Sequence, residues 1–446
     1  IEELNSYKQQ LSKLYQTIPK KNERETYKDR IKDLESNISE SEIYLSSKLD
    51  EFKEELGLRN INYKDISSKL KDKEIYVDFA KTEDNYFVFT LDNKNNITYE
   101  KINKKTTTNI NKNVKVFREN IDTLLKSTDL TKEKLDTLNV DAKIVLSNLY
   151  EDIVGSLNKT ISNIKTKDTL IFSLDGVLNF LPFEALYDKT TNQYLIEKKN
   201  IKYVPSGKEF VRLLKKKAKE STKNKENKSV TMFTNPDYGL KLPPSKTKET
   251  LYTPNTRASS FLHKSLFSMI FKPLPGTVEE ANLISTLYSN AKDYNKEEAT
   301  SNNLFTVNSP KILHISTHGF FLKDKNITNP MLKAGLAFTG ANMARVKGDS
   351  QGVVTGLKLA GLNLTNTDLV VLSACETGLG DVNEAEGVTG LNKAFIKAGA
   401  KNIVMSLWSV ADKETAQLMK EFYSNIKNNS SYQKSLKDSK LKMIKE

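Results

Sequence analysis

Two residues that could perform nucleophilic chemistry follow short apolar segments in the second half of the chain. His318 follows the segment KILHIST and Cys375 follows DLVVLSA, and a glycine comes within three residues of each. A thiol with a pKa of about 8.5 is mostly protonated at neutral pH, and a neighbouring imidazole can convert it to the nucleophilic thiolate. The pair could therefore carry out cysteine-based acyl transfer if the fold brings it together.

A structural interpretation of the same two residues stays open. Cys375 could be a small buried hydrophobe, and His318 a polar residue at a strand end. Against this, both residues precede glycine-containing turns, and Cys375 is the one cysteine in 446 residues. If the site is catalytic, the backbone N–H groups of Gly319 and Cys375 are the expected donors to a substrate oxyanion.

The spacing of His314 and His318 would suit a zinc site if it fell on a helix. The β-branched residues around His314 predict a strand instead, where the two imidazoles lie about 13 Å apart. We therefore expect a structural role for His314, and neither a metal nor another cofactor.

The elements that must position the pair alternate between strand and helix. Strands are predicted at 230–234, 311–317, 368–374 and 402–407, and helices at 279–288, 387–397 and 413–426. Continuous apolar strands interleaved with helices predict an α/β fold with a mostly parallel sheet covered by helices on both faces. Sites in such folds form at the carboxyl ends of the strands, where His318 and Cys375 are both expected.

The first half of the chain shows a different order of elements. Residues 1–58 have helical spacing of apolar residues, and such helices cannot bury their apolar faces alone. Strands follow at 74–79 and 85–91 with a turn at 93–96, then helices at 113–125 and 130–164 and a strand at 169–174. The Pro- and Thr-containing region 240–272 predicts an insertion.

Composition limits the class of protein. A length of 446 residues predicts two or three domains, and 37% hydrophobic with 28% charged residues is typical of globular chains. No segment approaches the roughly 18 apolar residues of a membrane span. A single cysteine excludes an internal disulfide and favours the cytoplasm. The missing initiator Met indicates that further sequence precedes Ile1.

The net charge of +13 permits an anionic partner such as nucleic acid. The densest basic cluster, residues 215–228, lacks the interleaved aromatic residues of a base-stacking surface. It is interpreted as a solvated linker, and direct nucleic-acid binding is the weaker hypothesis.

Several ordered blocks resemble the CHAT domain, a family of caspase-like cysteine peptidases often fused to TPR repeats. The resemblance extends over about residues 70–427 and departs from the narrow caspase signature, since SACET replaces QAC followed by Arg, Gln or Gly. The blocks are HISTHGF (314–320), SACETGLG (373–380), EGVTGLNKAFIKAGA (386–400), SLWSVAD (406–412), and upstream LPGTVEEA (274–281), NPDY (235–238) and SLDGVLNFLPFEAL (173–186).

The resemblance implies a catalytic dyad, with His318 as general base and acid and Cys375 as nucleophile. It also implies a caspase-like sheet sandwiched by helices, in which an inactive, pseudo-caspase half precedes the active half. The expected domains are 1–66, a helical region resembling the end of a TPR array; 67–234, the inactive half; and 235–446, the active half with its insertion near 240–272.

Substrate-pocket candidates are Asp412, Glu386 and Ser373. The segment SLWSVAD resembles a stretch of separase, a related peptidase that cleaves after arginine, and a carboxylate at Asp412 could pair with that side chain. Asp412 also suits an N-cap, and Glu386 could complement a helix dipole. Trp408 and Met405 are expected in the core.

The resemblance implies a regulated cytoplasmic endopeptidase that cleaves a partner protein, in bacterial defence or cell-death signalling. The substrate could be a gasdermin-like protein or another protein encoded nearby, and the regulator an upstream array of helical repeats or an activator protein. Nucleic acid would act only indirectly, through a coupled CRISPR effector, and no membrane is involved. The alternative is a catalytically silent scaffold that binds protein or RNA through its helical region and basic surface.

Overall fold

The computed structural model describes most of the chain, and its gaps include some of the predicted functional residues. Cys375 and the glycines after it lie outside the described residues, as does most of the predicted insertion. For Glu386 and Asp412 only the backbone is described. The described residues are 7, 10, 24–48, 61–126, 131–155, 157, 166–220, 229–241, 269–322, 330–343, 352–373, 386–408, 412–428 and 430–445.

The first sheet joins an antiparallel meander to a parallel core, in the order β3-β2-β1-β4-β7. β2 pairs antiparallel with β1 and β3, whereas β4 pairs parallel with β1 and β7. The turn between β2 and β3 is held by the Asp92 carboxylate, which accepts from the backbone N–H of Lys94 at 2.8 Å and of Asn96 at 3.0 Å. The strands are β1 (Glu74–Lys81), β2 (Tyr86–Leu91), β3 (Ile97–Ile102), β4 (Thr169–Ser173) and β7 (Asn200–Tyr203).

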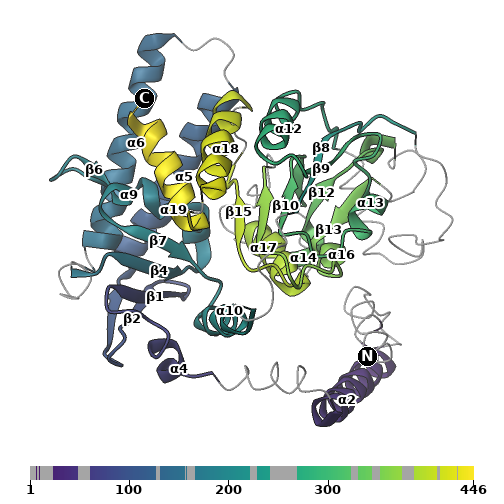
Figure 1. Cartoon of the computed structure of the whole chain (residues 1–446). Coiled ribbons are helices and arrows are strands. Elements are labelled where there is room, and N and C mark those ends of the chain that lie inside the picture. Colours follow the sequence, from purple (N-terminus) through teal and green to yellow (C-terminus); the bar gives the residue numbers. More distant parts are fainter. Residues whose placement is uncertain are drawn as a thin grey trace.

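Helices cover both faces of the first sheet (Figure 1). Ile110, Val114 and Leu149 bury the apolar faces of two long helices against one side of it. Phe210 and Val211 bury a third helix against the other side. These helices are α5 (Lys104–Lys126), α6 (Lys132–Tyr150) and α10 (Gly207–Glu220); shorter elements are α4 (Tyr63–Ser67), α9 (Leu195–Lys198), η3 (Glu151–Gly155), η4 (Gly176–Phe180), η5 (Phe183–Ala185), β5 (Tyr187–Asp188) and β6 (Gln193–Tyr194), and α2 (Arg24–Lys48) precedes them all.

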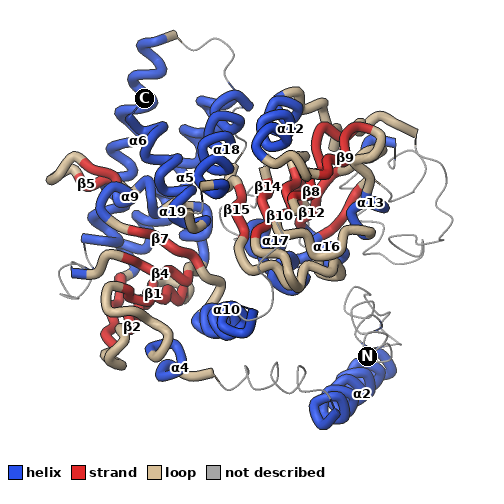
Figure 2. Tube along the Cα trace, viewed as in Figure 1, coloured by secondary structure: helices blue, strands red, loops and turns tan. Residues whose placement is uncertain are grey.

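The second sheet is wholly parallel, in the order β15-β14-β10-β8-β9. All residues of β10 and β14 are buried, as their continuous apolar sequences predict. Figure 2 shows these strands between two helical layers. The elements are β8 (Val230–Pro236), β9 (Lys292–Lys296), β10 (Ile312–Ile315), β14 (Leu369–Leu372) and β15 (Ile403–Met405), with α12 (Gly276–Leu287) and α18 (Asp412–Lys427) on one face and α16 (Gly356–Leu359) and α17 (Glu386–Ala398) on the other.

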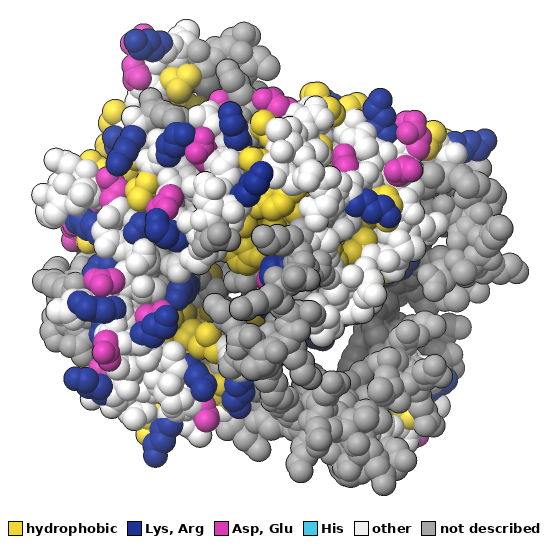
Figure 3. All heavy atoms as spheres, in the orientation of Figure 1, with side chains coloured by type: hydrophobic (Ala, Val, Ile, Leu, Met, Phe, Trp, Pro, Cys, Tyr) yellow, Lys and Arg dark blue, Asp and Glu magenta, His cyan; other side chains and the backbone are white. Residues whose placement is uncertain are grey.

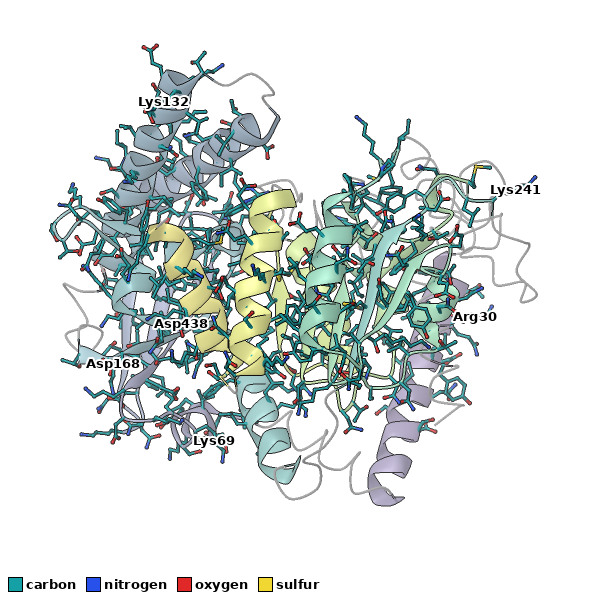
Figure 4. The ribbon with its side chains drawn as sticks, turned by 45° about the horizontal axis from the view of Figure 1, so that its top comes forward. Arg30, Lys69, Lys132, Asp168, Lys241 and Asp438 are labelled. Atoms are coloured by element: carbon teal, nitrogen blue, oxygen red, sulfur yellow. The ribbon has the colours of Figure 1, made fainter. Side chains whose placement is uncertain are left out.

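A three-stranded antiparallel sheet follows directly from the end of β10, and a C-terminal helix connects the two large sheets. On that helix, Lys437 Nζ lies 3.0 Å from Asn200 Oδ1, and Lys440 Nζ lies 3.3 Å from Glu184 Oε1 of the first half. Figure 4 shows this helix, which carries Asp438, beside α18. The remaining elements are β11 (Gly319–Phe321), β12 (Ala334–Ala337), β13 (Val353–Thr355), α13 (Ser301–Phe305), α14 (Pro330–Lys333) and α19 (Tyr432–Lys445).

The predicted α/β class is confirmed, with parallel strands flanked by helices. Strands β3, β7 and β9 were not predicted from the sequence, because their polar residues interrupt the run of apolar residues that indicates a strand. The predicted helix at 130–164 is confirmed over Lys132–Tyr150, after which the chain continues as a π-helical turn to Gly155, and residues 158–164 lie outside the described residues. β8 belongs entirely to the second sheet, so the chain passes between sheets before residue 230, ahead of the predicted boundary at 234. Among the helices that the structure describes, none has the length and apolarity needed to cross a membrane.

Asp368 ties the amino ends of three strands of the second sheet together. Its carboxylate lies 2.8 Å from Lys311 Nζ and 2.6 Å from Lys401 Nζ. Burial raises the pKa of this carboxyl, but the two ammonium groups outweigh burial and hold the pKa below its ordinary value. The ionised form therefore stabilises the fold.

We expect Asp368→Asn to lower the free energy of unfolding by about 1 kcal/mol at neutral pH, because the site is partly exposed. Since the folded-state pKa is depressed, this contribution is complete above the ordinary aspartate pKa of about 3.9 and disappears as the pH falls through the folded-state value. Urea unfolding at several pH values measures the difference. Asp438→Asn, in an exposed pair with Lys434, is the control and should change stability by less than about 0.5 kcal/mol. A loss for Asp368→Asn that is the same in acid and at neutral pH would contradict the assignment.

Candidate active site

Three neighbouring strands of the second sheet end at one edge, and the candidate residues follow these ends. β14 lies between β10 and β15, and all three run parallel. Each strand end is followed three positions later by one of these residues: His318 after β10, Cys375 after β14 and Trp408 after β15. The pairing continues past the strand ends, because Ser316 Oγ lies 3.4 Å from the Ser373 carbonyl oxygen and Ser373 N–H donates to the Ile315 carbonyl at 3.0 Å.

The imidazole of His318 is oriented by a backbone carbonyl. Its Nε2 lies 2.7 Å from the carbonyl oxygen of Lys272. A carbonyl can only accept, so this contact assigns the proton of the neutral ring to Nε2 and leaves the lone pair on Nδ1. Nδ1 is therefore the nitrogen able to take a proton from a nucleophile.

Two aromatic rings hold His318 from the side. The centroids of Tyr238 and Phe271 lie 5.2 Å and 5.7 Å from that of the imidazole. The Tyr238 hydroxyl accepts from the His318 backbone N–H at 3.3 Å and lies 3.0 Å from Thr317 Oγ1. The His318 side chain is half-buried, so the ring is fixed in place while part of it stays accessible.

A buried polar cluster lies directly behind the strand end. Ser316 Oγ donates to Glu280 Oε2 at 2.8 Å, and His314 Nδ1 lies 2.9 Å from the Tyr423 hydroxyl. His314 Nε2 and Glu280 Oε1 are 3.4 Å apart, an electrostatic contact without the alignment of a hydrogen bond. All four side chains are buried, so the predicted structural role of His314 on a strand is confirmed.

Removing the Tyr423 hydroxyl should destabilise the fold. Burial and the nearby Glu280 carboxylate raise the pKa of Tyr423 well above its ordinary value, so its hydroxyl stays protonated and can donate to His314. Tyr423→Phe leaves the buried Nδ1 without this donor and should lower the free energy of unfolding by about 1–3 kcal/mol, measured by urea denaturation. Tyr288→Phe, which loses a longer contact of 3.4 Å at a half-buried position, is the control and should cost less. Equal losses in the two variants would count against the cluster.

The end of β15 leaves the second half and packs into the core of the first. Met405, Leu407 and Trp408 are half-buried against the apolar cluster beneath the first sheet. The Trp408 ring meets Phe117 of α5 edge to face, with centroids 5.8 Å apart and planes at 80°. Trp408 and Met405 thus pack against a core, as expected, but both also line the groove between the two sheets.

The other predicted site residues are placed only in part. Gly319 is buried and opens β11. Ser373 is 7% exposed at the end of β14. The backbones of Glu386 and Asp412 open α17 and α18, and Cys375 lies outside the described residues. The oxyanion donors and the substrate pocket therefore stay predictions.

Sequence reasoning missed the groups that hold His318. Lys272 acts through its backbone carbonyl, which carries no signal in the residue type, and residues 269–272 fall within the predicted insertion. Tyr238 lies 80 positions before His318 in the chain. The block NPDY was a signal for a functional role of Tyr238, although it did not indicate which residue Tyr238 contacts.

A separate groove of about 3270 Å³ lies between the two sheets. Its lining includes Ser173 and Tyr203 from the first half and Leu372 and Trp408 from the second, but not His318. Figure 3 shows hydrophobic side chains gathered on the face where the two halves meet. The groove thus approaches the candidate site from the side of β15.

Comparison with known proteins agrees with this architecture. A family model of the CHAT domain matches residues 143–446. The match covers more than half of the chain, which therefore belongs to the CHAT domain family, a family related to caspase-like peptidases.

Two relatives are tetratricopeptide repeat proteins. The chain is 24% identical to tetratricopeptide repeat protein 28 of Mus musculus over 332 residues, which cover 69% of this chain and 13% of that protein. The human protein of the same name is 24% identical over 312 residues, which cover 64% of this chain and 12% of that protein. The chain thus spans about an eighth of the length of these relatives.

Proposed function

We propose that this chain is a cysteine endopeptidase in which Cys375 is the nucleophile and His318 the general base and acid. The observation that carries the proposal is the contact between Ser316 and Ser373, which keeps β10 and β14 paired one residue past their ends. These two serines are 57 positions apart, and so are His318 and Cys375, two residues further along each segment. The oriented His318 ring, with Nδ1 as its proton acceptor, supports the same assignment.

The reaction follows from these roles. His318 Nδ1 takes the thiol proton, and the thiolate attacks the scissile carbonyl carbon to form a tetrahedral oxyanion. The N–H groups of Gly319 and Cys375 are the proposed oxyanion donors. The C–N bond then breaks, and the imidazolium gives its proton to the leaving amine. Water, deprotonated by His318, hydrolyses the thioester and regenerates the thiol.

The proposed substrate pocket contains Asp412, Glu386 and Ser373. Asp412 opens α18 at the same edge of the sheet as the end of β15, where a carboxylate could receive a basic side chain of the substrate. The N-cap function remains the competing explanation for this residue.

The proposed substrate is a partner protein, such as a gasdermin-like protein or another encoded nearby, cleaved in the cytoplasm in bacterial defence or cell-death signalling. The relatives are named for tetratricopeptide repeats, which supports regulation by helical repeats upstream of the described domain. An untriggered state with low activity is then expected.

The test is to incubate the full-length protein, and Cys375→Ala as a control, with proteins encoded nearby and to sequence the new N-termini. New termini formed only by the wild-type protein support the proposal and supply the substrate and the cleavage site. If wild-type protein produces none and does not react with an electrophilic peptide probe, the scaffold alternative replaces it.

A further inference from the structure

Arg118 of α5 connects the first half of the chain to the end of β15. Its Nη1 donates to the carbonyl oxygen of Leu407 at 2.6 Å, and these residues are 289 positions apart in the chain. The guanidinium carbon lies 5.8 Å from the ring centroid of Trp408 and 5.5 Å from that of Phe180. One cation is thus held between an aromatic ring of each half.

The environment of Arg118 favours a fixed geometry. The residue is 6% exposed. Arginine remains charged when buried, and its planar group can stack on aromatic rings and donate to a carbonyl at the same time, which lysine cannot reproduce. Asp122, one turn further along α5, supplies an opposing charge.

The group that Arg118 holds lies at the candidate active edge. Leu407 and Trp408 follow β15, whose partner β14 ends at Leu372, just before the segment with Cys375. In the sequence, only residues 409–411 separate Trp408 from Asp412, the first residue of α18. The four residue steps from Trp408 to Asp412 span at most about 14 Å, so the position of Trp408 restricts where the proposed pocket residue can lie.

We propose that Arg118 is a positioning residue through which the first half of the chain sets the geometry of residues 406–408, which precede the proposed pocket residue Asp412 in the chain. The first half then has a role in specificity although it lacks the dyad. This inference rests on the proposed peptidase function for its effect on substrates, whereas its structural part concerns the position of Trp408 alone.

Trp408 is the single tryptophan in the chain, so intrinsic fluorescence reports on this segment directly. In Arg118→Gln, we expect a red-shifted emission maximum and at least a twofold larger quenching constant for acrylamide. Arg212→Gln is the matched control, because Arg212 lies on α10 of the same half and pairs with Glu209. The control should leave both values unchanged. Unchanged fluorescence in Arg118→Gln would overturn the inference, whether or not the protein cleaves peptides.

Kinetics separate positioning from general destabilisation. In Arg118→Gln, KM for peptide substrates should rise tenfold or more and the preference for the residue before the cut should broaden. The rate at which iodoacetamide, which needs no pocket, modifies Cys375 should stay within twofold. A parallel fall of the cleavage rate and of the modification rate, or an unchanged KM and an unchanged preference, would overturn the inference.

If Arg118→Gln does not fold, Arg118→Lys should show the same changes in weaker form. Failure of wild-type protein to cleave any peptide defeats the proposed function and leaves the fluorescence test to decide the inference.

Discussion

Replacing Cys375 by alanine is expected to lower kcat/KM for peptide cleavage by at least about 10³-fold, because it removes the thiol that is proposed to form the acyl-enzyme. The chain has one cysteine, so no second thiol can substitute for it. Binding of substrate should persist, since alanine removes the nucleophile and leaves the pocket. Cleavage assays, together with binding of the uncut substrate by the variant, provide the measurement.

Cys375→Ser is the informative companion, because a hydroxyl is far less acidic than a thiol and the site is arranged for a thiolate. It should be nearly as inactive as the alanine variant. Retained cleavage in Cys375→Ala would show that the chemistry takes place elsewhere.

Replacing His318 by glutamine is expected to lower kcat/KM by about 10²–10⁴-fold, the usual contribution of a general base and acid. Glutamine can still donate to the Lys272 carbonyl, so the local structure should be preserved while the proton acceptor is lost. The loss should fall mainly on kcat, since His318 acts on the bond-breaking steps. Steady-state kinetics with a cleaved peptide measure it.

The chain offers a matched control in its remaining histidines. The sequence has three, and His263→Gln, in the predicted insertion, should keep full activity. His314→Gln should lower stability through the buried Glu280 and Tyr423 contacts, with activity lost only in proportion to unfolded protein. A His318→Gln variant with wild-type kcat would refute the proposed role.

The sequence predicted those parts of the site that follow from periodicity. Continuous apolar residues in β10 and β14 identify buried parallel strands, and parallel strands end at a common edge, which brought His318 into the candidate site. The strand assignment also predicted that His314 and His318 lie too far apart to share a ligand. Their surroundings do differ, since His314 is buried beside Tyr423 and His318 lies beside Tyr238.

The parts that could not be predicted depend on contacts over long separations in the chain. The Lys272 carbonyl acts on His318 through its backbone, whatever its side chain. Arg118 and Leu407 are joined across 289 positions, and α5 shows only the periodicity of an ordinary amphipathic helix. Short polar strands such as β3 are fixed by pairing with their neighbour, since residues 97–102 match β2 in register although half of them are exposed.

The central claim is that the Cys375 thiol lies within reach of the His318 imidazole, and the pH dependence of Cys375 alkylation by iodoacetamide tests it most directly. The rate reports a single thiol, because the chain has one cysteine. The account predicts that in the wild-type protein the thiol has an apparent pKa at least about one unit below the ordinary value of about 8.5, and that His318→Gln returns the pKa to that value. Identical titration of wild-type protein and His318→Gln near about 8.5 would show that the two side chains do not meet, contradicting the claim.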